Sequence, residues 1–281
     1  MFKGKNILVT GGSGMIGRKV VKLLQERGAL VANASLPSND LRKPYWCEMI
    51  TRGRDFLFHI AGIKGSGKMT RERPADFLVP MLQMNTNILE AARLNGVKKI
   101  LYVSSTAVTH DEFPGIAKLV GEKQLEAYKQ QYGFDNWVVI RPNNVYGEDD
   151  RFDPDNGMFI PALMAKIQRG DNPVNLYGTG EDIRDFIYSG DVAEILVGAM
   201  EKTTGIYELG GGNQMTTAFV VNSILNFVDF NFKFDNEGNP TIRVVDSNPI
   251  YEATGYKPKV NIKEGLERVW KWYQQNLAKS G

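Results

Sequence analysis

The chain has 281 residues, 42% of them hydrophobic and 23% charged, with a formal net charge of +2. A chain of this length buries a large core and is long for one simple domain, so one domain plus an elaboration is expected. Its lysines and arginines are scattered, which gives binding of nucleic acid or of a membrane surface no electrostatic support. The expected partner is a small molecule or a second copy of the chain.

The inventory of reactive side chains is small, with one cysteine and two histidines. One cysteine excludes an internal disulfide framework, and the set is poor for a zinc site, so no metal is expected. The first residues lead straight into an apolar run without a signal-type segment, and no apolar run approaches membrane-spanning length. We therefore expect a cytoplasmic protein.

Apolar runs predict strands separated by segments with helical periodicity. The runs are Ile7 to Thr10, Leu30 to Asn33, Asp55 to Ile60, Ile100 to Ser104 and Trp137 to Ile140, with helical segments that include Lys19 to Arg27 and Asn85 to Asn95. Strands that alternate with helices imply a parallel sheet covered on both faces. The expected fold class is α/β, with a Rossmann-type doubly wound parallel sheet.

A glycine-rich stretch, Val9-Thr10-Gly11-Gly12-Ser13-Gly14-Met15-Ile16-Gly17, stands where the first strand gives way to the first helix. Absent side chains there let the backbone turn tightly and let a pyrophosphate approach the helix N-terminus. A glycine-rich turn without a ligand is the alternative, but the strand-to-helix context favours a nucleotide site. The sequence therefore predicts dinucleotide binding by Gly11, Gly14, Met15, Ile16 and Gly17.

The cofactor type depends on the end of the second strand, which reads Ala32-Asn33-Ala34-Ser35. It offers no carboxylate for the free ribose hydroxyl of NAD. NADP is therefore permitted, with Arg18 or Arg42 as partners of its extra phosphate, although both are equally well read as surface cations. The sequence leaves NAD and NADP open and leans to NADP.

After Gly147 the pattern changes to polar loops and irregular strands, and it closes with an amphipathic stretch from Ile262 to Leu277. This predicts a smaller C-terminal α/β lobe. We expect residues 1–147 to form the NAD(P)-binding domain and residues 148–281 mainly a substrate-binding lobe. Residues 181–200 are expected to return to the first domain.

Further segments occur in order along nearly the whole chain and resemble the extended short-chain dehydrogenase/reductases, the nucleotide-sugar epimerase and dehydratase group. They are Asn39 to Arg42, His59 to Gly62, Asn85 to Ala92, Val103 to Val108, Arg141 to Gly147 and Arg184 to Ala193. The resemblance implies that Asp40 and Leu41 contact the adenine and that Ala61 lies beside the cofactor. It implies that Ser105 is the catalytic serine.

Within that group the chain is most similar to the GDP-fucose synthases, the GDP-4-keto-6-deoxymannose epimerase/reductases. Two segments carry the similarity, Arg73 to Phe77 and Gly147 to Leu163. The resemblance implies bound NAD(P), a nucleotide-sugar substrate held by Asn144 and Arg184, and a homodimer through the helices near residues 87–93 and 117–128. The chain departs from that family at the epimerising cysteine and the histidine, which are Ala107 and Met158 here.

In the family's hydride-transfer chemistry a tyrosine exchanges a proton with the sugar oxygen, and a lysine four residues later lowers the tyrosine's pKa. The corresponding stretch reads Pro114-Gly115-Ile116-Ala117-Lys118, so the lysine is present and the tyrosine is not. By the resemblance, Lys118 binds the nicotinamide ribose. The link from the preceding strand is short, which leads to the hypothesis that His110 or Glu112 supplies the acid/base group. An exposed polar loop is the alternative.

Two other residues have interpretations of their own. His59 sits in an apolar run and is interpreted as a buried, hydrogen-bonded histidine. Tyr177, before Gly178-Thr179-Gly180, is a candidate to stack on the substrate's base.

Two functions are therefore kept. The leading hypothesis is an NAD(P)-dependent oxidoreductase or epimerase that acts on a GDP-hexose or a related sugar nucleotide with an atypical active site. The alternative is a catalytically impaired relative that keeps both pockets and acts as a binding partner subunit.

Overall fold

The computed structural model describes residues 1–110 and 112–277, and six parallel strands form its main sheet. The strand order is β10-β5-β4-β3-β1-β2. The strands are β1 (Asn6–Thr10), β2 (Leu30–Ala34), β3 (Phe56–His59), β4 (Lys99–Val103), β5 (Trp137–Pro142) and β10 (Gly205–Leu209). The predicted α/β class with a parallel Rossmann-like sheet is confirmed. The edge strand β10 was not among the predicted strands, because four of its five residues are only partly buried and its apolar pattern is weak.

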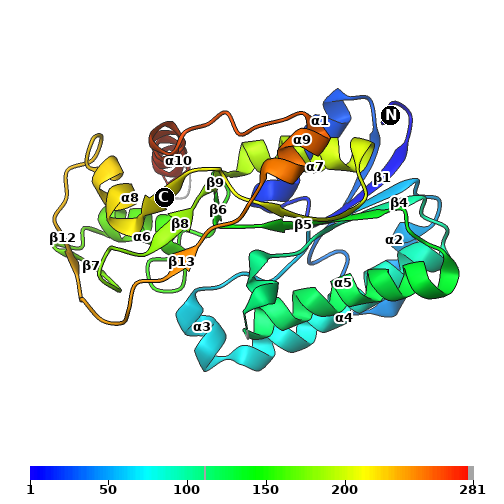
Figure 1. The fold of residues 1–281 in the computed structure, drawn as a ribbon, viewed down its shortest axis with the longest axis horizontal. Helices are drawn as coiled ribbons and strands as arrows, with labels where there is room; N and C mark the ends of the chain where they lie inside the picture. Colours follow the sequence, from blue (N-terminus) through cyan, green and yellow to red (C-terminus); the bar gives the residue numbers. More distant parts are fainter. Residues whose placement is uncertain (111, 278–281) are drawn as a thin grey trace.

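Helices cover both faces of this sheet (Figure 1). One face carries α1 (Met15–Glu26), α7 (Ser189–Lys202) and α9 (Asn248–Thr254), and the other carries α2 (Pro44–Thr51), α4 (Pro74–Leu94) and α5 (Phe113–Tyr132). Within β1, Ile7 and Val9 join the core under the first helix layer, whereas Leu8 joins the core under the second. Both faces are apolar because both are covered, which is why these strands read as continuous hydrophobic runs.

The C-terminal lobe lies at one end of the main sheet (Figure 1) and has its own core, which includes Leu163, Val220, Leu266 and Trp270. Its helices are α6 (Phe159–Arg169), α8 (Thr217–Ile224) and α10 (Ile262–Leu277). Its strand pairs are β7 (Val174–Leu176) with β12 (Phe232–Phe234), and β8 (Ile183–Asp185) with β11 (Gln214–Thr216) and β13 (Ile242–Arg243). The pair β6 (Val145–Tyr146) and β9 (Ile187–Tyr188) lies between the lobe and the main sheet. The bounds of α10 are those predicted from amphipathicity.

The remaining elements are two short helices, α3 (Gly67–Glu72) and the 3₁₀ turn η1 (Thr106–Thr109). The chain reverses its direction along the sheet after β1, since β2 and β3 lie on opposite sides of it. Loops that leave the carboxyl ends of β1 and β3 therefore diverge, and a ligand crevice forms between them. No described helix is long and apolar enough to cross a membrane.

Candidate active site

The glycine-rich turn after β1 forms one wall of a cavity of about 1350 Å³. Gly11 has a φ of +70°, and a Cβ placed on Gly17 would lie 2.0 Å from the carbonyl oxygen of Gly11. Turn and helix thus approach more closely than a side chain allows. α1 begins at Met15, with Gly14 as its N-cap and no side-chain capping bond. Its first N–H groups are therefore available to an anion, which fits the pyrophosphate of a dinucleotide.

The residues predicted from the sequence to bind the cofactor come together in this cavity. Its lining includes all of them: Gly11, Gly14, Met15, Ile16, Gly17, Asp40, Leu41, Ala61 and Lys118. Arg42 donates two parallel hydrogen bonds of 2.8 Å to the carboxylate of Asp40, and these bonds lower the pKa of Asp40. Arg42 lines the cavity, whereas Arg18 donates to the carbonyl of Ser13 and is turned toward Asp149. Of the two cations considered for an NADP phosphate, Arg42 is the one at the cavity.

Ser105 and Lys118 reach the cavity from two neighbouring elements. Ser105 follows β4 and caps η1, where its Oγ accepts a hydrogen bond from the N–H of Ala107. Lys118 comes from α5, and its Nζ donates to the carbonyl of Val103 at 2.7 Å and lies 5.0 Å from the ring centroid of Tyr102. Burial lowers the pKa of Lys118 to about 8. The ammonium is thus held at the carboxyl end of β4, the strand that Ser105 follows.

A buried polar chain supports this part of the site. The amide of Asn85 donates to the carbonyl of Ala117, so its Oδ1 accepts from Nε2 of His59 at 2.9 Å. The other ring nitrogen, Nδ1, then accepts from the hydroxyl of Thr10 at 2.7 Å. His59 is fully buried, and desolvation lowers its pKa to about 3, so the imidazole is neutral. The interpretation of His59 as a buried, hydrogen-bonded histidine is confirmed.

A second buried contact joins α5 to β5. Glu122, one turn after Lys118 and 1% exposed, receives two hydrogen bonds from the guanidinium of Arg141 and one from the hydroxyl of Ser104. A buried carboxylate requires such partners because an unpaired charge in the interior is strongly disfavoured. Glu122 also opposes the desolvation effect on the pKa of Lys118. These contacts hold the start of the Ser105 loop against the helix that carries Lys118.

The start of α5 carries the position at which the resemblance places a tyrosine. Pro114 occupies the second position of the helix, lines the cavity and has no hydroxyl to donate. The next residue, Gly115, has no room for a side chain, because a Cβ there would lie 2.2 Å from the carbonyl oxygen of Ala107. The two candidate acid/base residues diverge. His110 is exposed and is not among the residues that line the cavity, whereas Glu112 lines it. His110 is the C-cap residue of η1, which ends at Thr109.

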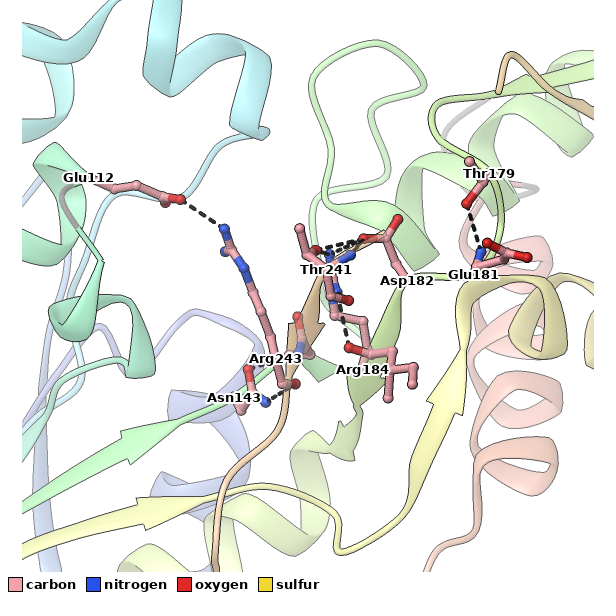
Figure 2. A network of polar contacts seen from close by, with 10 residues as sticks. Glu112, Asn143, Thr179, Glu181, Asp182, Arg184, Thr241 and Arg243 are labelled. Atoms are coloured by element: carbon pink, nitrogen blue, oxygen red, sulfur yellow. Dashed lines mark hydrogen bonds and ion pairs between the residues drawn. The ribbon is translucent and has the colours of Figure 1, made fainter. Parts of the chain in front are cut away.

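The opposite wall of the cavity carries two arginines, which Figure 2 shows at close range. Arg184 on β8 donates to the carbonyl and hydroxyl of Thr241 and to Asp182, and burial lowers its pKa. Arg243 on β13 pairs with Glu112 at 3.0 Å, a contact that crosses from the C-terminal lobe to α5. Asn144, with a φ of 35°, also lines this wall. Asn144 and Arg184, the two residues that the resemblance assigned to substrate binding, thus line the same cavity.

One predicted substrate residue lies elsewhere. Tyr177 is 72% exposed and is not among the lining residues of the cavity. It follows β7, which pairs with β12 at the far end of the lobe (Figure 1). Its hydroxyl lies beside Gly238 of the same lobe.

Sequence reasoning missed two residues on the lobe side of the cavity. Arg243 lies in a strand of two residues within an irregular segment, so no periodicity marks it. Asn143 lies within a segment that was recognised, but its fastening role was not: its amide donates to the backbone carbonyl of Arg243 at 2.9 Å. This contact ties β13 to the end of β5. Among the described residues, no group of His, Cys, Asp and Glu side chains is arranged to hold a metal ion.

Comparisons with known proteins agree with this geometry. The model of the NAD dependent epimerase/dehydratase family matches residues 7–210. GDP-L-fucose synthase 1 of Arabidopsis thaliana is 28% identical over 313 residues, covering 98% of this chain and 95% of that protein. The structure of UDP-glucose 4-epimerase from Thermotoga maritima with UDP-glucose is similar at a TM-score of 0.85 and 26% identity, covering 97% of this chain and 99% of that one. A GDP-6-OMe-4-keto-L-xylo-heptose reductase from C. jejuni, 21% identical, shares the fold at a TM-score of 0.86 over 98% of this chain and 99% of its own.

Proposed function

The chain belongs to the NAD dependent epimerase/dehydratase family, and from that premise we propose that it binds NAD(P) and acts by oxidation or reduction on a nucleotide-linked sugar. The proposed substrate is a GDP-hexose or a relative of it. One observation carries the proposal: the glycine turn, the Ser105 and Lys118 pair, and the two arginines of the lobe all line one cavity of about 1350 Å³. Sites for one small ligand measure about 300–1,000 Å³, so this cavity has room for a dinucleotide and a second ligand.

The cofactor half extends from the glycine turn to Lys118. The family uses NAD or NADP, and when bound the cofactor supplies or accepts a hydride. The glycine turn and the N-terminus of α1 hold its pyrophosphate, Asp40 and Leu41 contact the adenine, and Lys118 binds the nicotinamide ribose. NADP is the proposed cofactor, because Arg42 lines the cavity while the end of β2 itself carries no acid.

The substrate half is the wall formed by the C-terminal lobe. Arg184 and Arg243 offer two guanidinium groups to a diphosphate, and Asn144 adds an amide on the same wall. Ser105 orients the reacting sugar oxygen. Relatives named as GDP-L-fucose synthases support the GDP-hexose class. The reaction is a dehydrogenation, a ketoreduction or an epimerisation.

The proton-transfer group is the unusual part of this site. The resemblance places a tyrosine where the chain has Pro114, and His110 or Glu112 was the predicted substitute. We keep the substitution as a proposal and favour Glu112 over His110, because Glu112 lines the cavity. A catalytically impaired partner subunit is the second candidate function. It is favoured by Pro114 itself, together with Ala107 and Met158 at the positions of the family's cysteine and histidine.

A homodimer is part of the proposal. The resemblance assigns the contact to the helices that are α4 and α5 here, and these two pack side by side over one face of the sheet (Figure 1). Large apolar side chains are exposed on both helices, among them Val79 and Leu94 on α4 and Val120 and Tyr132 on α5. Analytical ultracentrifugation tests this part, since a monomer at micromolar concentration contradicts it.

The deciding experiment starts with mass spectrometry of small molecules released from the denatured protein. The protein is then incubated with GDP-4-keto-6-deoxymannose, GDP-mannose and UDP-glucose while nicotinamide absorbance is followed. A released NADP or NAD and a substrate-dependent absorbance change establish the enzyme and identify its cofactor. A cofactor without turnover on any of the three favours the partner-subunit function. Failure to bind either dinucleotide contradicts the proposal at its base.

A further inference from the structure

The two arginines of the lobe project into the cavity from neighbouring strands. Arg184 and Arg243 are register partners in the parallel pair β8 and β13, so their side chains leave the same face of this small sheet. Both line the cavity, and the charge of Arg243 contributes to lowering the pKa of Arg184 after the larger effect of burial. Two like charges held this close form a site for an anion with more than one charge.

The positive charges of the two guanidinium groups are neutralised by carboxylates from different parts of the molecule. Asp182, on the same lobe, pairs with Arg184 at 3.0 Å and is itself fixed by the hydroxyl and N–H of Thr241. Arg184 is thus held in place whether or not a ligand is present. For Arg243 the partner is Glu112, which stands on α5 on the other side of the cavity (Figure 2). The charge of Arg243 is neutralised from another part of the molecule.

The ion pair between Glu112 and Arg243 is weak enough for a ligand anion to replace the Glu112 carboxylate. Their side chains are 46% and 40% exposed, and pairs with this exposure contribute little to stability. Glu112 is the N-cap residue of α5, and its side chain makes no capping bond. A released carboxylate at that position remains next to the N-terminal end of a helix, which favours a negative charge. Glu112 therefore has a second favourable environment within reach of the first.

We propose that Glu112 forms an ion pair with Arg243 in the free protein, and that the diphosphate of a sugar nucleotide displaces the Glu112 carboxylate from this arginine. The inference rests on the proposed function, which assigns the substrate's diphosphate to this wall. A diphosphate carries more negative charge than one carboxylate and reaches Arg184 as well, so the exchange is favourable. Substrate binding thereby frees the carboxylate of Glu112 two residues before Pro114, at the position proposed for proton transfer.

Glu112 then lowers the affinity for every ligand that needs Arg243 and leaves other ligands unaffected. The test is calorimetric binding of GDP and UDP to the full chain and to the variants Glu112→Gln, Arg243→Gln and the double variant. Of GDP and UDP, we take the one that the wild type binds with higher affinity. Glu112→Gln is expected to bind it about two- to fivefold more tightly than the wild type does, the range that an exposed ion pair supports. In the Arg243→Gln background, Glu112→Gln is expected to change nothing.

Two controls make the result specific. Glu181→Gln removes an exposed negative charge from the same lobe, beside Thr179 in Figure 2, and is expected to leave diphosphate affinity unchanged. NADPH affinity, measured on every variant, reports that each one is folded. Equal diphosphate affinity in the wild type and in Glu112→Gln overturns this inference alone, as does an equal gain in the Arg243→Gln background. Failure of both diphosphates to bind any variant, with NADPH still bound, overturns the substrate assignment of the proposed function and this inference with it.

Discussion

Replacing Pro114 by tyrosine tests the proposal that the site lacks a proton-donating hydroxyl at this position. Residues 114 and 118 are one helical turn apart, so a tyrosine there shares a helix face with Lys118. The side chain of a helical residue leans toward the N-terminus, which is the end of α5 that borders the cavity. The change restores an N–H at the second helical position, where no intrahelical partner is needed. Loss of the proline ring lowers the free energy of unfolding by about 0.4–1 kcal/mol, because the unfolded chain gains conformational entropy.

The expected gain in turnover follows from what a positioned proton donor contributes. General acid catalysis is worth about 10²- to 10⁴-fold, or roughly 3 to 5 kcal/mol of activation free energy. The ammonium of Lys118 makes the new hydroxyl more acidic, because a nearby positive charge favours the phenolate. The gain falls toward the lower end of that range if Glu112 already transfers the proton in the natural chain.

The assay is the substrate-dependent change in nicotinamide absorbance with the three sugar nucleotides named above. Pro114→Phe is the matched control, because it fills the same space without a hydroxyl. We expect Pro114→Tyr to exceed both the wild type and Pro114→Phe by about 10²-fold or more. Equal rates for the two variants would refute the idea that this position lacks only a hydroxyl, and would move the proton transfer to another part of the cavity.

Three further predictions concern the cofactor turn and the buried groups behind the site. Gly17→Ala places a Cβ 2.0 Å from the carbonyl oxygen of Gly11, so we expect a loss of about 1–3 kcal/mol in thermal unfolding and of NADPH binding; retention of both contradicts the proposed turn. His59 has a folded pKa of about 3, below its usual 6.5, so the unfolded chain binds more protons below pH 6.5. Wild-type stability in urea should therefore fall by about 2 kcal/mol more than that of His59→Gln between pH 7 and pH 5, and parallel curves argue against a neutral, buried imidazole. Lys118 has a folded pKa of about 8, below its usual 10.5, so the wild type should gain about 2 kcal/mol relative to Lys118→Met between pH 8 and pH 10, and parallel curves would show an exposed ammonium.

Several parts of the molecule followed from the sequence because local chemistry determines them. The apolar runs of β1, β3, β4 and β5 are continuous because the sheet is covered on both faces, and these strands, with β2, were found from apolar runs alone. The turn from Gly11 to Gly17 was recognisable because only glycine tolerates such close backbone contacts. Position 114 and Lys118 are four residues apart, which is about one turn of a helix, so their relation could be predicted from a short stretch of sequence.

Other parts depend on how distant segments meet, and no local pattern records that. Glu112 and Arg243 are separated by 131 positions, and their contact exists because the lobe packs against the start of α5 across the cavity. The proposed preference for Glu112 over His110 likewise rests on the tertiary structure, because Glu112 lines the cavity and His110 does not. Tyr177 was a candidate because of the glycine turn after it and Arg184 because of the resemblance, and of the two only Arg184 lines the cavity. The sequence thus determined the sheet, the cofactor turn and the residue types available for chemistry. The tertiary structure alone decided which charged side chains face one another, because that depends on the docking of two lobes rather than on the periodicity of either.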